Sequence, residues 1–228
     1  MLEQILPGGV AVASTRGDIL DAALLPAEEA VVARAVEKRR REFASGRACA
    51  RRALAQVGVD SVAIPSGPRG EPQWPQGIVG SITHCEGYRG CAVARRSDFA
   101  TIGVDAEVDA GLPPGVLGDI ALAEERRQLT ELASASGGPS WDRLLFSIKE
   151  SVYKAWFPLA GCWLGFEDAS VIIDAKRRTF AARLLVPGPS LGGGELNGFS
   201  GEWWAGQGLL VSAIAVPAPE VESGPASC

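Results

Sequence analysis

The sequence predicts an α+β fold, with long helices and short strands of which at least two are antiparallel. One observation is helical spacing of apolar residues in two long segments, 42–57 and 140–156. The other is a series of short apolar runs of strand length, bounded by turn residues. A turn at residues 97–98 separates two such runs and predicts an antiparallel hairpin between them. The expected strands are residues 10–14, 91–95, 101–107, 169–173, 179–186, 201–205 and 209–216.

Local signals set the expected limits of the helices. Pro26 opens the first helix, because proline is accepted in the first turn. Gly58 ends the helix that begins near residue 42, and Ser140 is the expected N-cap of the long helix, which should stop ahead of Pro158. Composition predicts an irregular loop at 65–77, a linker at 109–116, a surface loop at 187–201 and a disordered tail at 217–228. The linker divides the chain into an N-terminal lobe, residues 1–108, and a C-terminal lobe, residues 109–216.

Composition excludes several classes of protein. The 228 residues suffice for one large domain or two modest lobes, with 46% hydrophobic and 21% charged residues. A net charge of −5 argues against a nucleic-acid binder, and no apolar run is long enough to span a membrane. The five cysteines form no CxxC pair, which favours reduced thiols in a cytoplasmic protein over a zinc or disulfide framework. No secretory signal opens the sequence.

Two acidic residues lie where a strand should be apolar. Ile102 and Val104 indicate a buried strand, and Asp105 and Glu107 follow at a spacing of two, which places both on one face. Like charges on one face repel unless a cation lies between them, and Mg²⁺ prefers carboxylate and phosphate oxygens. A solvated acidic turn is the alternative interpretation of this stretch taken alone.

Three further features have both a structural and a functional interpretation. A basic run is either a solvated helix face or an anion site; it comprises Lys38, Arg39, Arg40, Arg41, Arg47, Arg51 and Arg52. His84, the only histidine, follows Ser81 and Thr83 beside a glycine, so it is either an ordinary packed residue or part of an anion site. Glu150 and Lys154 are neighbours on one helix face, where a surface ion pair is the plain interpretation.

Taken together, these stretches resemble the motifs of a known family. Residues 103–107 (GVDAE) and 146–155 (FSIKESVYKA), about 40 residues apart, are similar to the two signature motifs of the 4′-phosphopantetheinyl transferases. Residues 80–85 (GSITHC) resemble a third motif of the two-lobed surfactin-type and enterobactin-type branch. Residues 39–54, 70–75 and 156–166 look most like the actinobacterial members. The resemblance covers roughly residues 25–216.

The resemblance implies a pseudo-twofold, two-lobed α+β fold, in which each lobe is a small antiparallel sheet packed with helices. Coenzyme A is expected in the cleft between the lobes. The implied reaction transfers 4′-phosphopantetheine from coenzyme A to a serine of an apo acyl or peptidyl carrier protein and releases adenosine 3′,5′-bisphosphate. Mg²⁺, or Mn²⁺ in its place, is the implied cofactor. Such chemistry depends on charge neutralisation and alignment, so the chain needs no nucleophile of its own.

The resemblance also implies roles for individual residues. Asp105, Glu107 and Glu150 match the metal ligands, and Ala106 matches a position whose backbone lies against the coenzyme. Lys154 and Lys149 match lysines at the diphosphate; Glu150 and Lys154 are the implied catalytic pair. Thr83 and His84 match residues near the coenzyme's phosphates, especially the 3′-phosphate. Arg39 and Arg47 match basic contacts to the coenzyme, with Arg40 or Arg51 as the alternatives if the register differs. The loop Ser66, Gly67, Pro68 and Arg69 matches the adenine end, although the family often has lysine where this chain has Ser66.

Two other functions remain open on the residues alone. A metal-dependent nucleotide phosphohydrolase would release phosphate without a carrier protein. The second alternative is a module that binds coenzyme A without catalysis. The presence of the acids and lysines of both signature motifs argues against it. We expect a cytoplasmic monomer that binds neither nucleic acid nor membrane, with carrier proteins docking on local apolar and basic patches.

Overall fold

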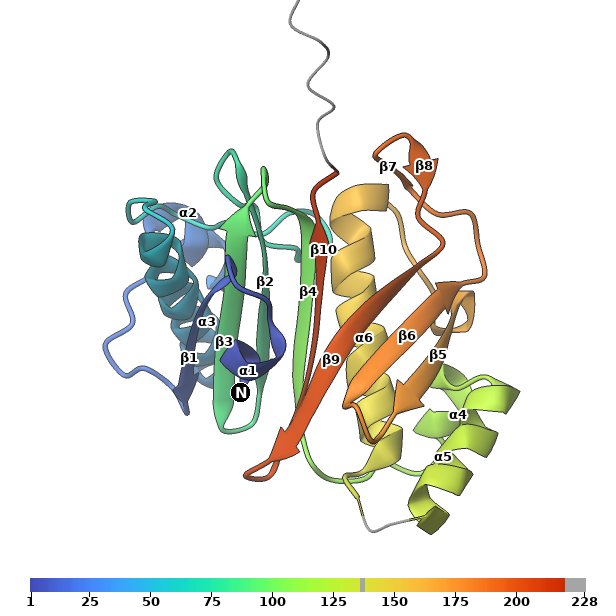
Figure 1. Cartoon of the computed structure of the whole chain (residues 1–228). Coiled ribbons are helices and arrows are strands. Elements are labelled where there is room, and N and C mark those ends of the chain that lie inside the picture. The colour runs from blue at the N-terminus through green and yellow to red at the C-terminus, as the bar shows by residue number, and fades with distance from the viewer. Residues whose placement is uncertain (136–137, 220–228) are drawn as a thin grey trace, which may run out of the picture.

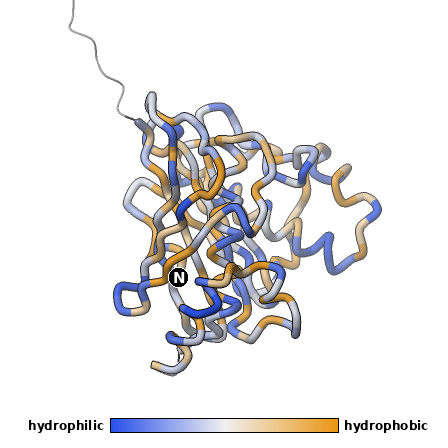
Figure 2. The backbone as a smooth tube through the Cα atoms, turned by 90° about the vertical axis from the view of Figure 1, so that its right-hand side faces the viewer, coloured by the Kyte–Doolittle hydropathy of each residue, from blue (hydrophilic) through white to orange (hydrophobic). Residues whose placement is uncertain are grey.

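The computed structural model describes residues 1–135 and 138–219 of the chain and confirms the α+β class. Two sheets lie side by side, and each packs against one long helix of 20 residues, α3 (Glu37–Gln56) and α6 (Trp141–Ala160) (Figure 1). Hydrophobic and hydrophilic residues alternate over short distances along the backbone (Figure 2), as expected for elements with one buried face.

The first sheet has three antiparallel strands in the order β1 (Ala11–Arg16), β3 (Tyr88–Arg95), β2 (Ile78–Cys85). Helix α3 covers one face, where its small residues Cys49 and Ala53 are fully buried with Leu54 against the sheet residues Ile78 and Val93. Small side chains let the helix approach the sheet closely, which explains the alanine-rich face of α3. The shorter elements of this half are α1 (Leu2–Ile5), α2 (Pro26–Glu29) and the 3₁₀ turn η1 (Ala30–Val32).

The second sheet has five antiparallel strands in the order β4 (Phe99–Val108), β10 (Leu209–Pro217), β9 (Gly198–Gly206), β6 (Thr179–Leu184), β5 (Ala169–Asp174). Helix α5 (Ala123–Ala135) covers the β5 edge: Gln128 bonds to Val171 O and to Ile173 N–H, and Glu125 accepts from Val171 N–H. These side chains satisfy backbone groups that an open sheet edge would expose. The remaining elements are α4 (Val116–Ile120), η2 (Phe166–Asp168), β7 (Ser190–Leu191) and β8 (Gly194–Glu195).

Side-chain hydroxyls connect the two sheets. The backbone N–H groups of Val104 and Ala106 in β4 donate to Ser81 Oγ (3.1 Å) and Thr83 Oγ1 (2.8 Å) in β2. The strands β2 and β4 thus run side by side without a backbone ladder between them. Because β4 pairs with β10 on its other edge, it belongs to the five-stranded sheet while contacting the first half. The lobe boundary at residue 108 therefore stays a prediction.

The predicted hairpin between 91–95 and 101–107 is wrong. Both edges of β3 are occupied, by β1 and by β2, so β4 has no free edge of β3 to pair with and joins β10 instead. The choice between these partners depends on residues more than 100 positions away in the sequence, which no local turn signal contains.

Two element ends also differ from expectation. Helix α6 continues through Pro158 to Ala160, and the capping residue Gly161 has a φ of 65°, in the left-handed region that glycine accepts. Proline this close to the helix end removes few hydrogen bonds, so the helix tolerates it. At the other end of the chain, Pro217 completes β10 and Ala218 N–H donates to Asp98 O; residues 220–228 of the predicted tail lie outside the described residues.

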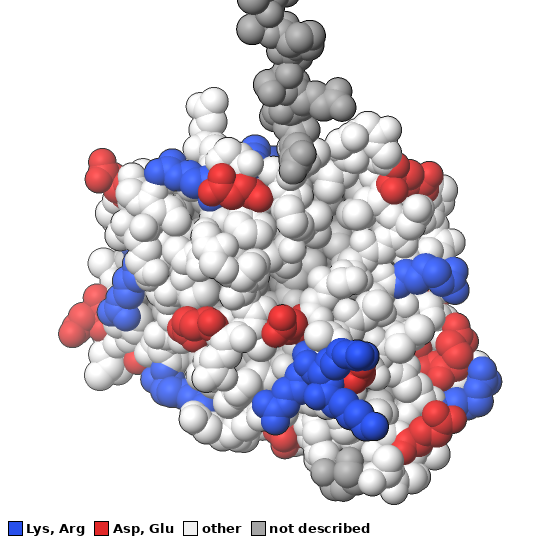
Figure 3. Space-filling model, in the orientation of Figure 1, with Lys and Arg blue, Asp and Glu red and all other residues white. Residues whose placement is uncertain are grey.

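Among the described residues, no helix is both long and apolar enough to cross a membrane. On the face shown in Figure 3, acidic and basic side chains both occur, in places next to one another, with uncharged areas between the groups, consistent with the modest net charge of −5.

Candidate active site

The predicted acidic strand lies directly under helix α6. A Cβ atom added to Gly103 would stand 2.0 Å from Ser151 O and 2.8 Å from Ala155 N, so glycine is required for this close approach. The approach brings the helix residues Glu150 and Lys154 to the strand residues beyond Gly103. It is the local reason that the two signature stretches meet, although they are about 40 residues apart.

Asp105 is buried and pairs with Lys154. The Lys154 ammonium lies 2.7 Å from Asp105 Oδ1 and also donates to Val104 O at 3.1 Å. Thr83 Oγ1 donates to the same carboxylate oxygen at 3.3 Å. The second oxygen, Asp105 Oδ2, is buried and has no hydrogen-bond partner among the described residues. An unpartnered buried carboxylate oxygen is costly, and it is available to a ligand.

Glu107 pairs with an arginine that the sequence argument overlooked. Arg143 Nη1 donates to Glu107 Oε2 at 3.1 Å, and both side chains are about one-fifth exposed. Burial and the neighbouring Asp105 raise the pKa of Glu107 to about 7, against the opposing effect of Arg143. The spacing contained a usable signal, because Arg143 lies seven residues before Glu150 and hence on the same helix face.

Glu150 is the carboxylate of this group without a cation of its own. No ion pair or hydrogen bond within the described part of the chain involves its side chain. Burial raises its pKa; Lys154 opposes the shift and Asp105 adds to it. Asp105 therefore influences both Glu107 and Glu150, as expected for carboxylates gathered around one place.

The three acids do not form a ready-made metal site. Across residues 1–135 and 138–219, no group of three or more His, Cys, Asp or Glu side chains is placed to hold an ion. Asp105 and Glu107 instead take protein cations. The cation of Glu107, Arg143, comes from helix α6 rather than from the neighbouring sequence.

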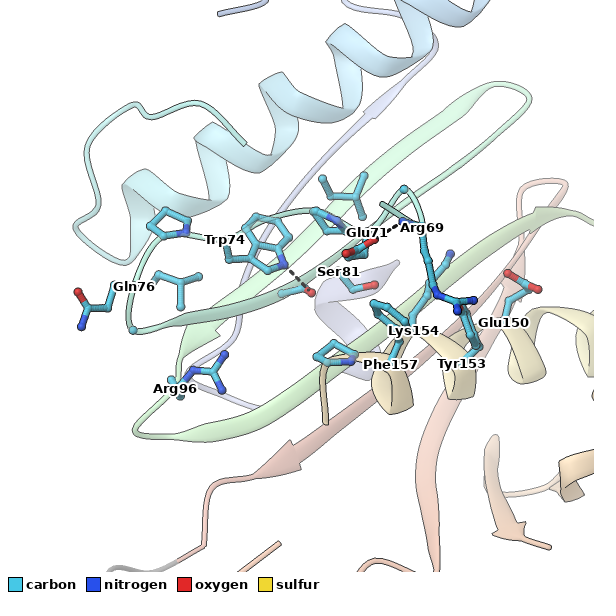
Figure 4. Close-up of a pocket in the computed structure, with 18 residues that line it drawn as sticks. Arg69, Glu71, Trp74, Gln76, Ser81, Arg96, Glu150, Tyr153, Lys154 and Phe157 are labelled. Carbon is cyan, nitrogen blue, oxygen red and sulfur yellow. Dashed lines mark hydrogen bonds between the residues drawn. The ribbon is translucent and has the colours of Figure 1, made fainter. Parts of the chain in front are cut away.

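A cleft of about 640 Å³ opens beside Glu150 and Lys154. Figure 4 shows Glu150, Tyr153, Lys154 and Phe157 projecting from α6, with Trp74 on the loop that follows α3 facing them. The Trp74 indole N–H donates to Gly80 O at 2.9 Å and fixes this loop against β2. The cleft is bounded by both halves of the molecule, as expected for a site between lobes.

A second cavity of about 400 Å³ adjoins the cleft and shares Gly70, Pro72 and Ile82 with it. Its lining includes five predicted coenzyme contacts: Arg39, Arg47, Ser66, Gly67 and His84. Arg39 Nη1 lies 2.8 Å from His84 Nε2, and burial together with Arg39 lowers the pKa of His84. The imidazole is thus neutral at pH 7 and accepts from Arg39, so the arginines supply the positive charge.

The other basic candidates have internal partners. Arg47 donates to Ile64 O and Ser66 Oγ, lies 4.1 Å from the centre of the Phe43 ring, and has its pKa lowered to about 10 by burial. Arg51 is bonded to Glu28, which is fully buried, and to Ala23 O. Arg40 donates to Val32 O. Arg39 and Arg47 line the second cavity whereas Arg40 and Arg51 do not, so the first two are better placed for an anion.

Four predicted residues lie in surroundings that the sequence did not indicate. Thr83 is 1% exposed and Ala106 is fully buried, and each uses its polar group within the protein. Lys149 is 2% exposed at its side chain, where its ammonium contacts Glu125 (2.9 Å), Phe166 O and Ala169 O, so the structure does not bring it to Glu150 and Lys154. Pro68 is exposed, and its neighbour Arg69 lines the first cleft.

Comparison with known proteins gives matches along most of the chain. Residues 27–94 match the family described as 4′-phosphopantetheinyl transferase N-terminal domain, and residues 101–191 match the 4′-phosphopantetheinyl transferase superfamily.

Three relatives are similar over most of both chains. The chain is 55% identical over 196 residues to 4′-phosphopantetheinyl transferase Svp of Streptomyces mobaraensis, which covers 86% of this chain and 80% of the relative. It is 48% identical over 223 residues to the transferase Npt of Nocardia iowensis, covering 94% and 99%. It is 45% identical over 196 residues to PptT of Mycobacterium tuberculosis, covering 84% and 86%. All three sources are actinobacteria, as the resemblance predicted.

Proposed function

This chain belongs to the 4′-phosphopantetheinyl transferases, and from that premise we propose how its own residues bind coenzyme A, hold Mg²⁺ and modify a carrier protein. The family activity is the transfer of 4′-phosphopantetheine from coenzyme A to carrier proteins. Nothing in the comparisons supports a phosphohydrolase or a coenzyme-binding module without catalysis. The observation that supports the site assignment is that Glu150 and Lys154, the latter paired with Asp105 at 2.7 Å, line the cleft, and that this cleft adjoins the second cavity.

The coenzyme is proposed to lie across the two adjoining cavities. Its 3′-phosphate is the most anionic part outside the diphosphate, and Arg39 with Arg47 offers two guanidinium groups in the second cavity. Lys154 lines the first cleft, which supports a position of the diphosphate beside it. His84 contributes as a hydrogen-bonding partner of Arg39 rather than as a charge.

Asp105, Glu107 and Glu150 would hold the Mg²⁺. Their fit is one of chemistry: all three offer hard oxygen ligands, Asp105 Oδ2 is buried without a partner, and Glu150 has no cation within the described residues. With Lys154 and Arg143 counted, the group carries one net negative charge, which favours a cation. Bound there, the ion would supply positive charge that makes the reacting phosphorus more electrophilic.

The reaction forms one bond and breaks one. The carrier serine oxygen attacks the phosphorus that bears pantetheine, and the bond from that phosphorus to the oxygen of the adenosine 5′-phosphate breaks. The serine proton leaves as the new bond forms, and adenosine 3′,5′-bisphosphate is released. Lys154 is proposed to stabilise the charge that develops on the departing phosphate. Glu150, beside it on the helix, is the acceptor available to the serine proton.

Intact mass measurement of an apo carrier protein tests the function. The carrier is incubated with the protein, coenzyme A and Mg²⁺, alongside Asp105→Asn and a reaction without enzyme. The proposal expects a gain of one phosphopantetheine with the wild type only. Consumption of coenzyme A without carrier modification would instead identify a hydrolase, and binding without either change would identify a non-catalytic module.

A further inference from the structure

Arg143 makes three hydrogen bonds that fix its guanidinium. Nε donates to Ala110 O at 3.1 Å, Nη2 donates to Gly111 O at 3.2 Å, and Nη1 donates to Glu107 Oε2 at 3.1 Å. The first two acceptors are backbone carbonyls of the segment that follows β4. The fork of an arginine can serve all three directions at once because its donors lie in one plane.

The segment that holds Arg143 is itself tied to the start of α6. Leu112 N–H donates to Asp142 Oδ2 at 2.9 Å, and Ser140 N–H donates to Asp109 Oδ1 at 2.8 Å. Neither bond uses Arg143. The carbonyls of Ala110 and Gly111 therefore belong to a segment that is held in place without Arg143. We infer that these carbonyls set the orientation of the guanidinium, and not the reverse.

We propose that Arg143 is the positioning residue of Glu107: it holds Oε2 so that Oε1 is presented to the divalent cation. This inference rests on the proposed function, because it assigns Glu107 to the cation. Two of the three bonds fix the guanidinium to the backbone, and the third gives Glu107 Oε2 a fixed partner before the cation arrives. A group hydrogen-bonded behind a metal ligand in this way orients it and strengthens binding.

Arg143 could instead compete with the metal ion, and the two roles predict opposite changes in metal affinity when Arg143 is removed. A cation next to a carboxylate also competes electrostatically with a metal ion, and removal of Arg143 changes the net charge of the acidic group from −1 to −2. If competition dominated, loss of Arg143 would tighten metal binding. The backbone anchors argue for positioning, because a competing arginine needs freedom to leave and two of these three bonds do not involve Glu107.

Mn²⁺ binding, followed by the electron paramagnetic resonance signal of the free ion, tests this role without any turnover. The wild type, Arg143→Met and Arg143→Lys are titrated with coenzyme A saturating, at about pH 8 so that Glu107 is ionised. Arg177→Met is the matched control, because Arg177 also lies 3.1 Å from an acid, Asp174, but on the exposed surface. Thermal melting of each variant reports the fold separately.

Arg143→Met is expected to weaken Mn²⁺ binding about tenfold or more, the usual effect of losing a group behind a metal ligand. Arg143→Lys keeps the charge but cannot bridge both carbonyls and Glu107, so it should also bind weakly. The control should match the wild type. In a Glu107→Gln background, Arg143→Met should add little further loss, because the residue that it positions no longer ligates.

Three results would overturn the role. Unchanged binding in Arg143→Met would leave Arg143 with a purely structural function, and tighter binding would make it a competitor. Wild-type binding in Arg143→Lys would show that charge alone matters. A wild type that binds no Mn²⁺ even with coenzyme A present refutes the proposed metal site itself, and is thereby distinguished from a failure of Arg143 alone.

Discussion

Lys154 pairs with Asp105 on the neighbouring strand, at 2.7 Å, rather than with Glu150 one turn earlier on its own helix. A surface pair between Lys154 and Glu150 was the plain interpretation of the sequence, and the structure replaces it with a contact between α6 and β4. The side chains are 26% and 7% exposed, so the pair is largely withdrawn from water. Lys154 consequently has a structural role that accompanies its proposed catalytic one.

Lys154→Met is expected to remove both the structural and the catalytic contribution of Lys154. Removal of the ammonium leaves Asp105 charged and buried, and we expect a loss of about 2 kcal/mol in the free energy of unfolding, between surface and fully buried pairs. Carrier modification should fall by about 10²–10³ in turnover, because the charge on the leaving phosphate loses a fixed cation. Denaturant titration measures the first effect and intact carrier mass over time the second.

The double variant Asp105→Asn with Lys154→Met separates the two effects. With no charge left to bury, stability should recover to near the wild type, whereas carrier modification should stay lost. If Lys154→Met alone modified the carrier at a rate within a few-fold of the wild type, Lys154 would have a purely structural role.

The raised pKa of Glu107 predicts a dependence on pH. An acid whose pKa rises from 4.5 to about 7 on folding favours the folded state below pH 4.5, and that contribution is lost as pH rises through about 7. The metal-free protein should therefore lose thermal stability between about pH 5 and 7.5. Mg²⁺ should restore more of it at pH 8 than at pH 6, because proton and metal compete and affinity falls about tenfold per pH unit below the pKa.

Glu107→Gln is the control for this assignment. Glutamine keeps the shape and an oxygen but does not titrate in this range, so the variant should lose much of the pH dependence of both quantities. Melting temperatures with and without Mg²⁺, measured across the pH range in both proteins, give the comparison. A Mg²⁺ effect of equal size at pH 6 and pH 8 in the wild type would contradict the prediction.

Local patterns were enough to locate the acidic pair and most of the strands, although β2 (Ile78–Cys85) was not among the expected ones. The predicted runs 169–173 and 209–216 match β5 and β10 closely, since alternation and turn residues are local. The same-face placement of Asp105 and Glu107 is also confirmed, because both carboxylates meet cations of the same helix, α6. Strand pairing is not local, and the hairpin prediction failed for that reason.

Roles of individual side chains were harder to predict than their positions. Lys149 and Glu150 are adjacent in one motif, but consecutive helix residues point about 100° apart, so Lys149 reaches Glu125 instead. Likewise, nothing local indicates that Arg51 belongs to the buried Glu28, 23 residues earlier. Partners of charged groups are set by tertiary packing, which the motif alone does not contain.

Thr83 offers a test of the junction between the two halves. Its hydroxyl accepts the Ala106 N–H at 2.8 Å and donates to Asp105 Oδ1, so Thr83→Val leaves a buried N–H without a partner while keeping the shape. We expect a loss of about 1–3 kcal/mol in the free energy of unfolding. Thr83→Ser retains the hydroxyl and should lose less. Equal destabilisation by both variants in a denaturant titration would mean that packing, not the hydroxyl, matters.

The second cavity predicts discrimination between coenzyme A and its dephospho form. Arg39 and Arg47 face this cavity, and a charged hydrogen bond is worth about 1.5–3 kcal/mol, so coenzyme A should bind at least tenfold more tightly. Because His84 is neutral and the charge resides on Arg39, Arg39→Met should reduce the difference in affinity between the two ligands more than His84→Ala does.

Arg52→Met, in the same helix but outside the cavity lining, is the matched control and should leave the ratio of the two affinities unchanged. Calorimetric titration of each protein with both ligands measures the ratio, and equal affinity of the wild type for the two would remove the 3′-phosphate from this cavity.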